Sequence, residues 1–338
     1  MGSECKNYKS ELNLLAEENY DNKKMMTLLK KDLLVLGEKD YIELLSDTDS
    51  YNYFNKFYFY CENTNAFYMV VKVLSRKTIT SFRVLDDDYF YYKIGKKGFI
   101  NIWKGSEKMN KYKKMNFVPL LECPSDTYNT FGGFAYESGN KIYNMSEIVE
   151  ILDFIKYVLV SEKNYNYFMR WVSHIRQKPY EKTGVGIILY SDMQGVGKNL
   201  MINIFGKIFS GYNGMLDRNL MNSRFNKLLE SKLFVYGDEM NITNKRVMGK
   251  LTKLITQETI EIKPKGKKSY EMRDNINYIF TTNDCMVMEI KNPFYKPINC
   301  AETRKSSKYY ENIANIINNE TKMRELDKYL ASLDLPII

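Results

Sequence analysis

The chain has 338 residues, of which 44% are hydrophobic and 27% charged, a balance that supports a folded protein of one large or two ordinary domains. The formal net charge of +9 favours an anionic partner but also fits a lysine-rich surface that serves solubility, so charge alone decides nothing. Five widely spaced cysteines and a single histidine argue against a disulfide framework and a zinc site, and they indicate a reducing compartment.

The N-terminal segment has no apolar core of the signal-peptide type. No stretch approaches the ~18 uncharged apolar residues that a membrane span needs. We therefore expect a soluble protein without a secretion or membrane signal.

Two kinds of pattern divide the first 180 residues. Residues 9–46 carry apolar residues at the spacing of a helix face, whereas residues 56–104 are rich in aromatic and β-branched residues broken by turn formers, which is typical of short strands. We predict a small α+β domain over 1–120, for DNA contact or assembly. The Pro-, Gly- and Ser-containing segment 124–140 indicates a boundary, and helical patterns from 145 to 179 complete a linker and helical collar over 121–180.

From residue 181 onward, strand and helix signals alternate. Short apolar runs at 184–190, 232–240 and 276–284 read as buried strands, and the apolar spacing at 201–208 and 245–256 is that of helices. Such alternation predicts an α/β domain over 181–338 whose mostly parallel sheet has helices on both faces.

The first apolar run leads into "SDMQGVGKNLM" (191–201), which nearly matches the phosphate-binding pattern G-x-x-x-x-G-K-[ST]. Asp192 stands at the first glycine position. The expected nucleotide-binding residues form the rest of the loop and the start of the helix: Gln194, Gly195, Val196, Gly197, Lys198 and Asn199. Backbone N–H groups and the Lys198 ammonium would hold the phosphates. An ordinary strand-to-helix turn would also account for the glycines.

Two further strands end in polar residues. Asp238 and Glu239 follow "LFVYG", an arrangement in which one carboxylate holds Mg²⁺ and the next polarises the attacking water. Asn283 ends "INYIFTTN", where an amide could orient water or the γ-phosphate. Each would fit a turn by itself, but their order after a glycine loop favours catalysis, with Lys198, Asp238, Glu239 and Asn283 as the catalytic set.

These segments, together with "WVSHIRQKPYEKTGVGIILYSDMQGVGKN", "SRFNKLLESKLFVYGDEM" and "GKLTKLITQETIEIKPKGKK", resemble the superfamily 3 helicase domain of phage, plasmid and large DNA virus primase-helicases. The resemblance covers about residues 125–330. It implies an AAA+-like P-loop ATPase that uses ATP and Mg²⁺, forms a hexameric ring and pulls single-stranded DNA through its centre. It also implies replication of a viral, phage or plasmid genome in the host cytoplasm or a viral replication compartment, with a primase or polymerase on another chain as a candidate partner.

In such rings a basic hairpin before the third strand reaches into the pore. Here "IEIKPKGKKSYEM" has strand-like arms around a Pro-Lys-Gly turn. Its lysines, Lys263, Lys265, Lys267 and Lys268, would contact the phosphodiester backbone without reading base sequence. A solvated hairpin tip is the alternative.

The chain departs from the family pattern at three further positions that bear on catalysis. Asn199 replaces the hydroxyl residue, and its amide oxygen would join Asp238 in binding Mg²⁺. Asn292 and Pro293 replace the arginine pair that usually follows the third strand. Arg304, the nearest downstream arginine, could act instead on the nucleotide of a neighbouring subunit.

The leading interpretation is therefore an ATP-dependent DNA helicase or translocase. A ring or scaffold that binds nucleotide and nucleic acid without unwinding is the alternative, because an arginine finger accelerates hydrolysis by several powers of ten and none is identified. A metabolic P-loop kinase would lack a visible acceptor site and would leave the lysine hairpin unexplained.

Overall fold

The computed structural model describes residue 55 and residues 58–73, 76–81, 107, 109–139, 141–217, 221, 223, 225–265 and 268–335. It divides the chain into two compact units, 1–133 and 134–338. The predicted helix over 9–46 lies outside the described residues, as does Lys267. The segment 121–180, predicted as a linker and collar, is divided between the two units.

The described part of the first unit is built of short strands. β1 (Tyr58–Cys61), β2 (Ala66–Val73) and β3 (Arg76–Ser81) form an antiparallel meander, and β4 (Lys111–Tyr112) adds to β1 in parallel. β5 (Lys114–Asn116) pairs with β6 (Thr127–Asn129). The Phe59 ring stacks on Tyr68 and Tyr128, with ring centroids 5.2 and 4.0 Å away, so aromatic packing holds this small core. The strand prediction is confirmed for 58–61, 66–73 and 76–81.

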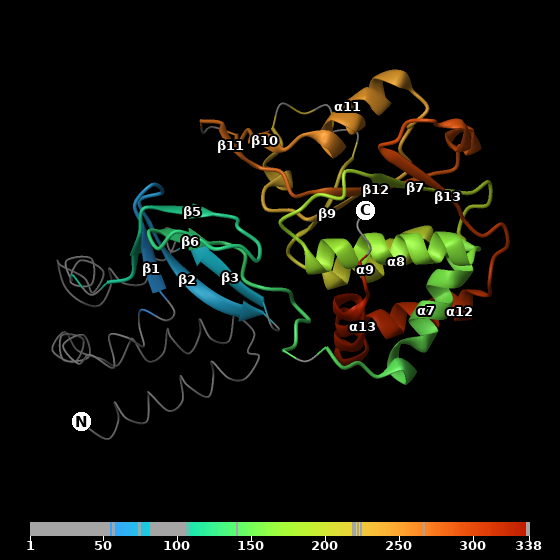
Figure 1. Ribbon diagram of the computed structural model, residues 1–338, viewed down its shortest axis with the longest axis horizontal. Coiled ribbons are helices and arrows are strands. Elements are labelled where there is room, and N and C mark those ends of the chain that lie inside the picture. Colours follow the sequence, from blue (N-terminus) through green and yellow to red (C-terminus); the bar gives the residue numbers. More distant parts are fainter. Residues whose placement is uncertain are drawn as a thin grey trace. The chain divides into compact units, whose positions relative to one another are not determined.

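The second unit is a mixed α/β structure around a five-stranded parallel sheet (Figure 1). The strand order is β13-β7-β12-β9-β8. The strands are β7 (Gly186–Tyr190), β8 (Asn213–Met215), β9 (Phe234–Gly237), β12 (Asn277–Thr282) and β13 (Tyr295–Asn299). All four pairings are parallel, and β12 is buried along its whole length. The predicted parallel sheet is confirmed.

Helices cover both faces of this sheet. α11 (Lys245–Thr256) lies on one face, and α8 (Glu162–Gln177) and α9 (Lys198–Ile208) lie on the other (Figure 1). The apolar residues predicted to face inward on α9, Met201, Ile204, Phe205 and Ile208, are all fully buried. On α11, Leu251 and Ile255 are buried in the same cluster as β9 and β12 residues. Helical spacing in the sequence therefore predicted the packed faces correctly.

A second helical layer closes the unit on the α8 side. α7 (Met145–Leu159), α12 (Ser307–Ile317) and α13 (Glu320–Ser332) pack around α8 and α9. Each begins at a side-chain cap, since Asn144, Ser306 and Asn319 accept hydrogen bonds from backbone N–H groups of the first turn. No helix among the described residues has the length and apolarity that crossing a membrane requires.

A buried ion pair joins two of these helices across the chain. Arg176 on α8 donates from Nε and Nη2 to the two carboxylate oxygens of Asp327 on α13, at 2.6 and 2.9 Å. The side chains are 7% and 1% exposed, and the guanidinium also lies over the Phe134 ring. Both charges are removed from water, so the loss of either partner would leave the other as a poorly compensated buried charge.

We predict that Asp327→Ala lowers the free energy of unfolding of the second unit by about 3–5 kcal/mol, because the buried guanidinium then keeps only the partly exposed Glu137 carboxylate, 3.9 Å away. Lys322→Ala is the control, since Lys322 pairs with the exposed Glu150 and its loss should cost less than about 1 kcal/mol. Urea unfolding followed by Trp171 fluorescence, with Trp103 replaced by Phe, measures both. Equal effects of the two substitutions would contradict a special role for the buried pair.

Candidate functional site

The candidate site lies where three neighbouring parallel strands end. β12 is the middle strand, with β7 on one side and β9 on the other, and Thr282 is in register with Tyr190 of β7. The loops that follow the three strands carry the glycine loop, the acidic pair and Asn283. The sheet topology therefore brings together residues that are up to 92 positions apart in the sequence, from Ser191 to Asn283.

The glycine loop between β7 and α9 needs its glycines. Gly195 and Gly197 have φ values of 73° and 102°, a region that disfavours residues with a side chain. A Cβ on Gly197 would also come within 2.9 Å of the Phe154 ring. Gly197 provides no side-chain cap to α9, so its first N–H groups are available to an anion at the positive end of the helix.

Lys198 opens α9 and turns its ammonium into the site. Nζ donates to Ser191 Oγ at 2.6 Å and to Asn283 Oδ1 at 3.1 Å, and the backbone oxygen of Thr282 is 3.5 Å away. All three partners are neutral oxygens, and the residue is only 9% exposed. Burial lowers the pKa of Lys198 below its usual 10.5, against the opposing effect of nearby acidic groups. A strong anion would therefore relieve an unfavourable environment.

The acidic pair is positioned by a threonine of the middle strand. Thr281 Oγ1 donates to Asp238 Oδ1 at 2.5 Å and accepts from the Glu239 N–H at 3.1 Å. Glu239 adopts φ 47°, an uncommon conformation for a residue with a side chain. Asn199 Nδ2 donates to Asp238 Oδ2 at 3.1 Å, so the two predicted metal ligands are neighbours. Carboxylate and amide oxygens are the hard donors that Mg²⁺ prefers. Here Asn199 turns its amide nitrogen toward Asp238, and the described residues contain no cluster of three or more His, Cys, Asp or Glu side chains, so the Mg²⁺ site stays a prediction.

Sequence reasoning missed two hydroxyl residues of this network. Ser191 bonds to Lys198, and Thr281 bonds to Asp238. The only signal in the sequence is their position at the ends of apolar runs, "LYS" and "IFTTN". Asp192 replaces the first glycine of the pattern. It accepts a hydrogen bond from Cys285 Sγ at 2.9 Å, and this bond raises the pKa of the Cys285 thiol to about 11.

Arg304 lies against the glycine loop of its own chain. Its Nε donates to the backbone oxygen of Gln194 at 2.5 Å, and the guanidinium is 3.3 Å from where a Cβ on Gly195 would lie. Tyr157 donates to the backbone oxygen of the preceding Thr303, and Tyr310 accepts from the N–H of the following Lys305. Action on a neighbouring subunit stays a prediction, and the observed contacts place the guanidinium beside the glycine loop of its own chain.

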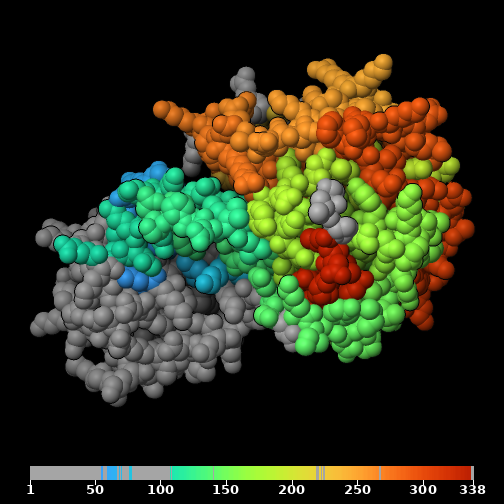
Figure 2. All heavy atoms as spheres, in the orientation of Figure 1, coloured from blue at the N-terminus to red at the C-terminus, as the bar shows by residue number. Residues whose placement is uncertain are grey.

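The lysine hairpin forms as predicted but shares none of the hydrogen bonds above. β10 (Thr259–Ile262) pairs with β11 (Tyr270–Arg273) in antiparallel fashion, and the hairpin projects from the second unit (Figure 2). Lys263, Lys265 and Lys268 are exposed. Lys263 forms an ion pair with Glu261 at 2.8 Å. The structure thus brings together Lys198, Asn199, Asp238, Glu239 and Asn283. The hairpin lysines form a separate group.

Comparisons with known proteins match part of this chain. Residues 189–293 match the model of a family described as a "Family of unknown function (DUF5906)". Over 204 residues, 57% of this chain, the sequence is 30% identical to a DNA primase-polymerase of Nitratiruptor phage NrS-1. The match covers 27% of that relative, so this chain corresponds to little more than a quarter of its length.

Solved structures of the C-terminal region of NrS-1 share the fold. One apo structure of residues 305–718 superposes with a TM-score of 0.66 at 22% identity, covering 88% of this chain and 70% of that one. The A form apo structure gives a TM-score of 0.61 at 21% identity, covering 82% and 66%. The chain is thus similar in sequence and in fold to a phage replication protein.

The burial of Lys198 predicts a pH effect on stability. Because its pKa is lowered in the folded state, Lys198 binds more protons in the unfolded chain, so the contribution of this residue to stability rises with pH and levels off near 10.5. Without nucleotide, Lys198→Met should be at least as stable as the wild type at about pH 7 and should gain less between about pH 7 and about pH 10. Urea midpoints at both pH values test this. A destabilised variant with an unchanged pH slope would contradict it.

Proposed function

We propose that residues 134–338 form an ATP-dependent motor of superfamily 3 helicase type, with an AAA+-like P-loop core, that acts in phage or viral DNA replication. The proposal rests on the buried Lys198 ammonium at the start of α9, which donates to Asn283 after β12. The acidic pair follows β9 on the other side of β12 and bonds to Thr281 of that strand. The similarity to a phage DNA primase-polymerase supports a place in DNA replication.

Each residue of the site has a distinct task in this proposal. Lys198 and the backbone of residues 194–198 bind the β- and γ-phosphates of ATP. Asn199 and Asp238 hold Mg²⁺, which neutralises the charge that develops on the phosphates. Glu239 orients and polarises the attacking water. Asn283 senses the γ-phosphate, because its Oδ1 already accepts a hydrogen bond from the Lys198 ammonium that binds this phosphate.

The proposed motor would assemble as a homo-oligomeric ring, hexameric as the family resemblance implies, with single-stranded DNA as its track. Lys263, Lys265, Lys267 and Lys268 would contact the strand backbone, where each neutralised phosphate releases counterions. A ring that binds nucleotide and DNA without unwinding remains the second candidate, favoured by Asn292 and Pro293 at the usual arginine positions.

Replacing Glu239 by Gln should leave ATP affinity near that of the wild type and lower turnover at least about 100-fold, because the general base is lost. Lys198→Ala should weaken ATP binding about tenfold or more, since a charge-assisted hydrogen bond contributes about 1.5–3 kcal/mol. Glu258→Gln is the matched control, because Glu258 is exposed just beyond α11. ATP binding and DNA-stimulated phosphate release measure these effects.

The two candidate functions give different results in the same assay. A motor hydrolyses ATP in the wild type, and single-stranded DNA accelerates the reaction. A non-catalytic ring binds ATP without turnover, so Glu239→Gln would change nothing. A wild-type chain that does not bind ATP would rule out both candidate functions.

Arg304 should act on the nucleotide of its own chain. In that case Arg304→Ala weakens ATP binding even by monomers, and mixing it with the Lys198→Ala chain restores no hydrolysis. Action on a neighbouring subunit would instead assemble complete sites in the mixture, at about a quarter of the positions in a randomly mixed ring. Phosphate release by the equimolar mixture, compared with each variant alone, distinguishes the two arrangements.

A further inference from the structure

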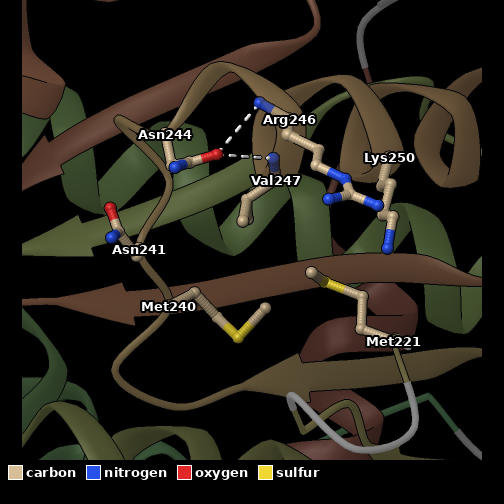
Figure 3. Close-up of a pocket in the computed structure, with 7 residues that line it drawn as sticks. All are labelled: Met221, Met240, Asn241, Asn244, Arg246, Val247 and Lys250. Carbon is tan, nitrogen blue, oxygen red and sulfur yellow. Dashed lines mark hydrogen bonds between the residues drawn. The ribbon is translucent and has the colours of Figure 1, made fainter. Parts of the chain in front are cut away.

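A groove runs along α11, away from the contacts of the candidate site. It consists of two adjoining hollows of about 340 and 410 Å³ that share Met221 and Lys250. The first begins beside Met240, directly after the acidic pair, and the second ends at Lys263, where the hairpin loop starts. We call this surface the α11 groove. Figure 3 shows the first hollow, with Arg246 and Lys250 on one wall and both methionines opposite.

The charged side chains of the groove are almost all cationic. Arg246, Lys250 and Lys253 follow each other at helical spacings of four and three residues, so they lie on one face of α11. Lys263 adds a fourth cation at the far end. Glu261 is the one carboxylate among the described lining residues, and it already pairs with Lys263 at 2.8 Å. The groove therefore matches a polyanion.

The length of the groove favours an extended ligand. The side chains of α11 and its C-cap that line it run from Arg246 to Gln257, about 16 Å at 1.5 Å per residue. Met240, on the opposite side, is 2% exposed and belongs to the core, so the cationic side offers most of the contact. A row of cations of this length suits the repeated phosphates of an extended strand.

A compact triphosphate fits this surface less well. Such a ligand uses free backbone N–H groups at a helix N-terminus. At the start of α11 the Asn244 side chain already accepts from the N–H groups of Arg246 and Val247, as the dashed lines in Figure 3 show. Anion binding here would rest on flexible arginine and lysine side chains spread along a helix.

The groove also leads to the lysine hairpin. Asn226, which lines the second hollow, donates to the Glu261 backbone oxygen at 2.9 Å and accepts from the Lys263 N–H at 2.8 Å. This double contact fixes the base of the hairpin against the groove wall. Single-stranded DNA that passes the hairpin lysines would therefore reach the α11 groove next.

We propose that the α11 groove binds single-stranded DNA, with its phosphates on Arg246, Lys250 and Lys253. This contact lies outside the hairpin and extends the track to the edge of the acidic pair. The proposal shares with the proposed function only the binding of single-stranded DNA, and it needs no ATP hydrolysis.

The test compares three double variants of the full chain by anisotropy of a fluorescent oligothymidylate. Arg246→Glu with Lys250→Glu should weaken binding about tenfold or more and make the salt dependence shallower by about 1.4, for two lost phosphate contacts. Lys245→Glu with Lys308→Glu makes the same change in net charge at exposed positions that do not line the groove, and it should have a smaller effect. Lys265→Ala with Lys268→Ala reports the hairpin alone.

ATP affinity without DNA completes the design. The inference requires it to stay near the wild-type value in the groove variant. Loss of ATP affinity with unchanged DNA binding would overturn the inference and make the groove a nucleotide site. DNA affinity equal to that of the charge-matched control, or a wild-type chain that binds no oligonucleotide, would also overturn it. If the wild type binds DNA through the groove but binds no ATP, the inference stands and the proposed function fails.

A second pair of substitutions and a protection experiment test the contact without the glutamate variant. Arg246→Ala with Lys250→Ala removes the same contacts without adding carboxylates and serves if the glutamate variant is unfolded. In the wild type, the oligonucleotide should protect Lys250 and Lys253 from acylation, read by mass spectrometry, while Lys245 stays reactive. Equal protection of all three lysines would contradict a groove-specific contact.

Discussion

The position of β12 between β7 and β9 is the constraint on which the candidate site depends. Parallel strands bring their carboxyl ends to one edge of the sheet, so the middle strand can contact residues that follow both neighbours. Thr281 reaches Asp238 on one side, and Asn283 reaches Lys198 on the other. A shift of β12 by one residue would turn these side chains to the opposite face and separate the site into unconnected parts.

Two buried cations of the second unit show opposite solutions to desolvation. Arg176 is fully paired with Asp327, so its burial is compatible with a stable helical layer. Lys198 has only neutral oxygens as partners, and its lowered pKa records that the charge is poorly compensated. The first arrangement suits a permanent structural contact. The second leaves binding energy available to an anion, which is the behaviour expected of a phosphate site.

α11 lies along the chain between the two candidate regions of the second unit. Its N-cap Asn244 follows the acidic pair by a few residues, and its last turn leads into the lysine hairpin. Leu251 and Ile255 pack the helix against the sheet. If both proposals hold, the basic face of the same helix carries the DNA between the site of hydrolysis and the hairpin.

The sequence by itself determined the alternation of strands and helices, the inward faces of α9 and α11, the hairpin, and the order of the glycine loop, acidic pair and Asn283. These features are local, because periodicity and turn residues act over a few positions. The tertiary structure alone decided that Ser191 and Thr281 complete the polar network and that Arg304 lies against its own glycine loop. Strand order and long-range packing decide such contacts, and a single sequence carries no local signal for either.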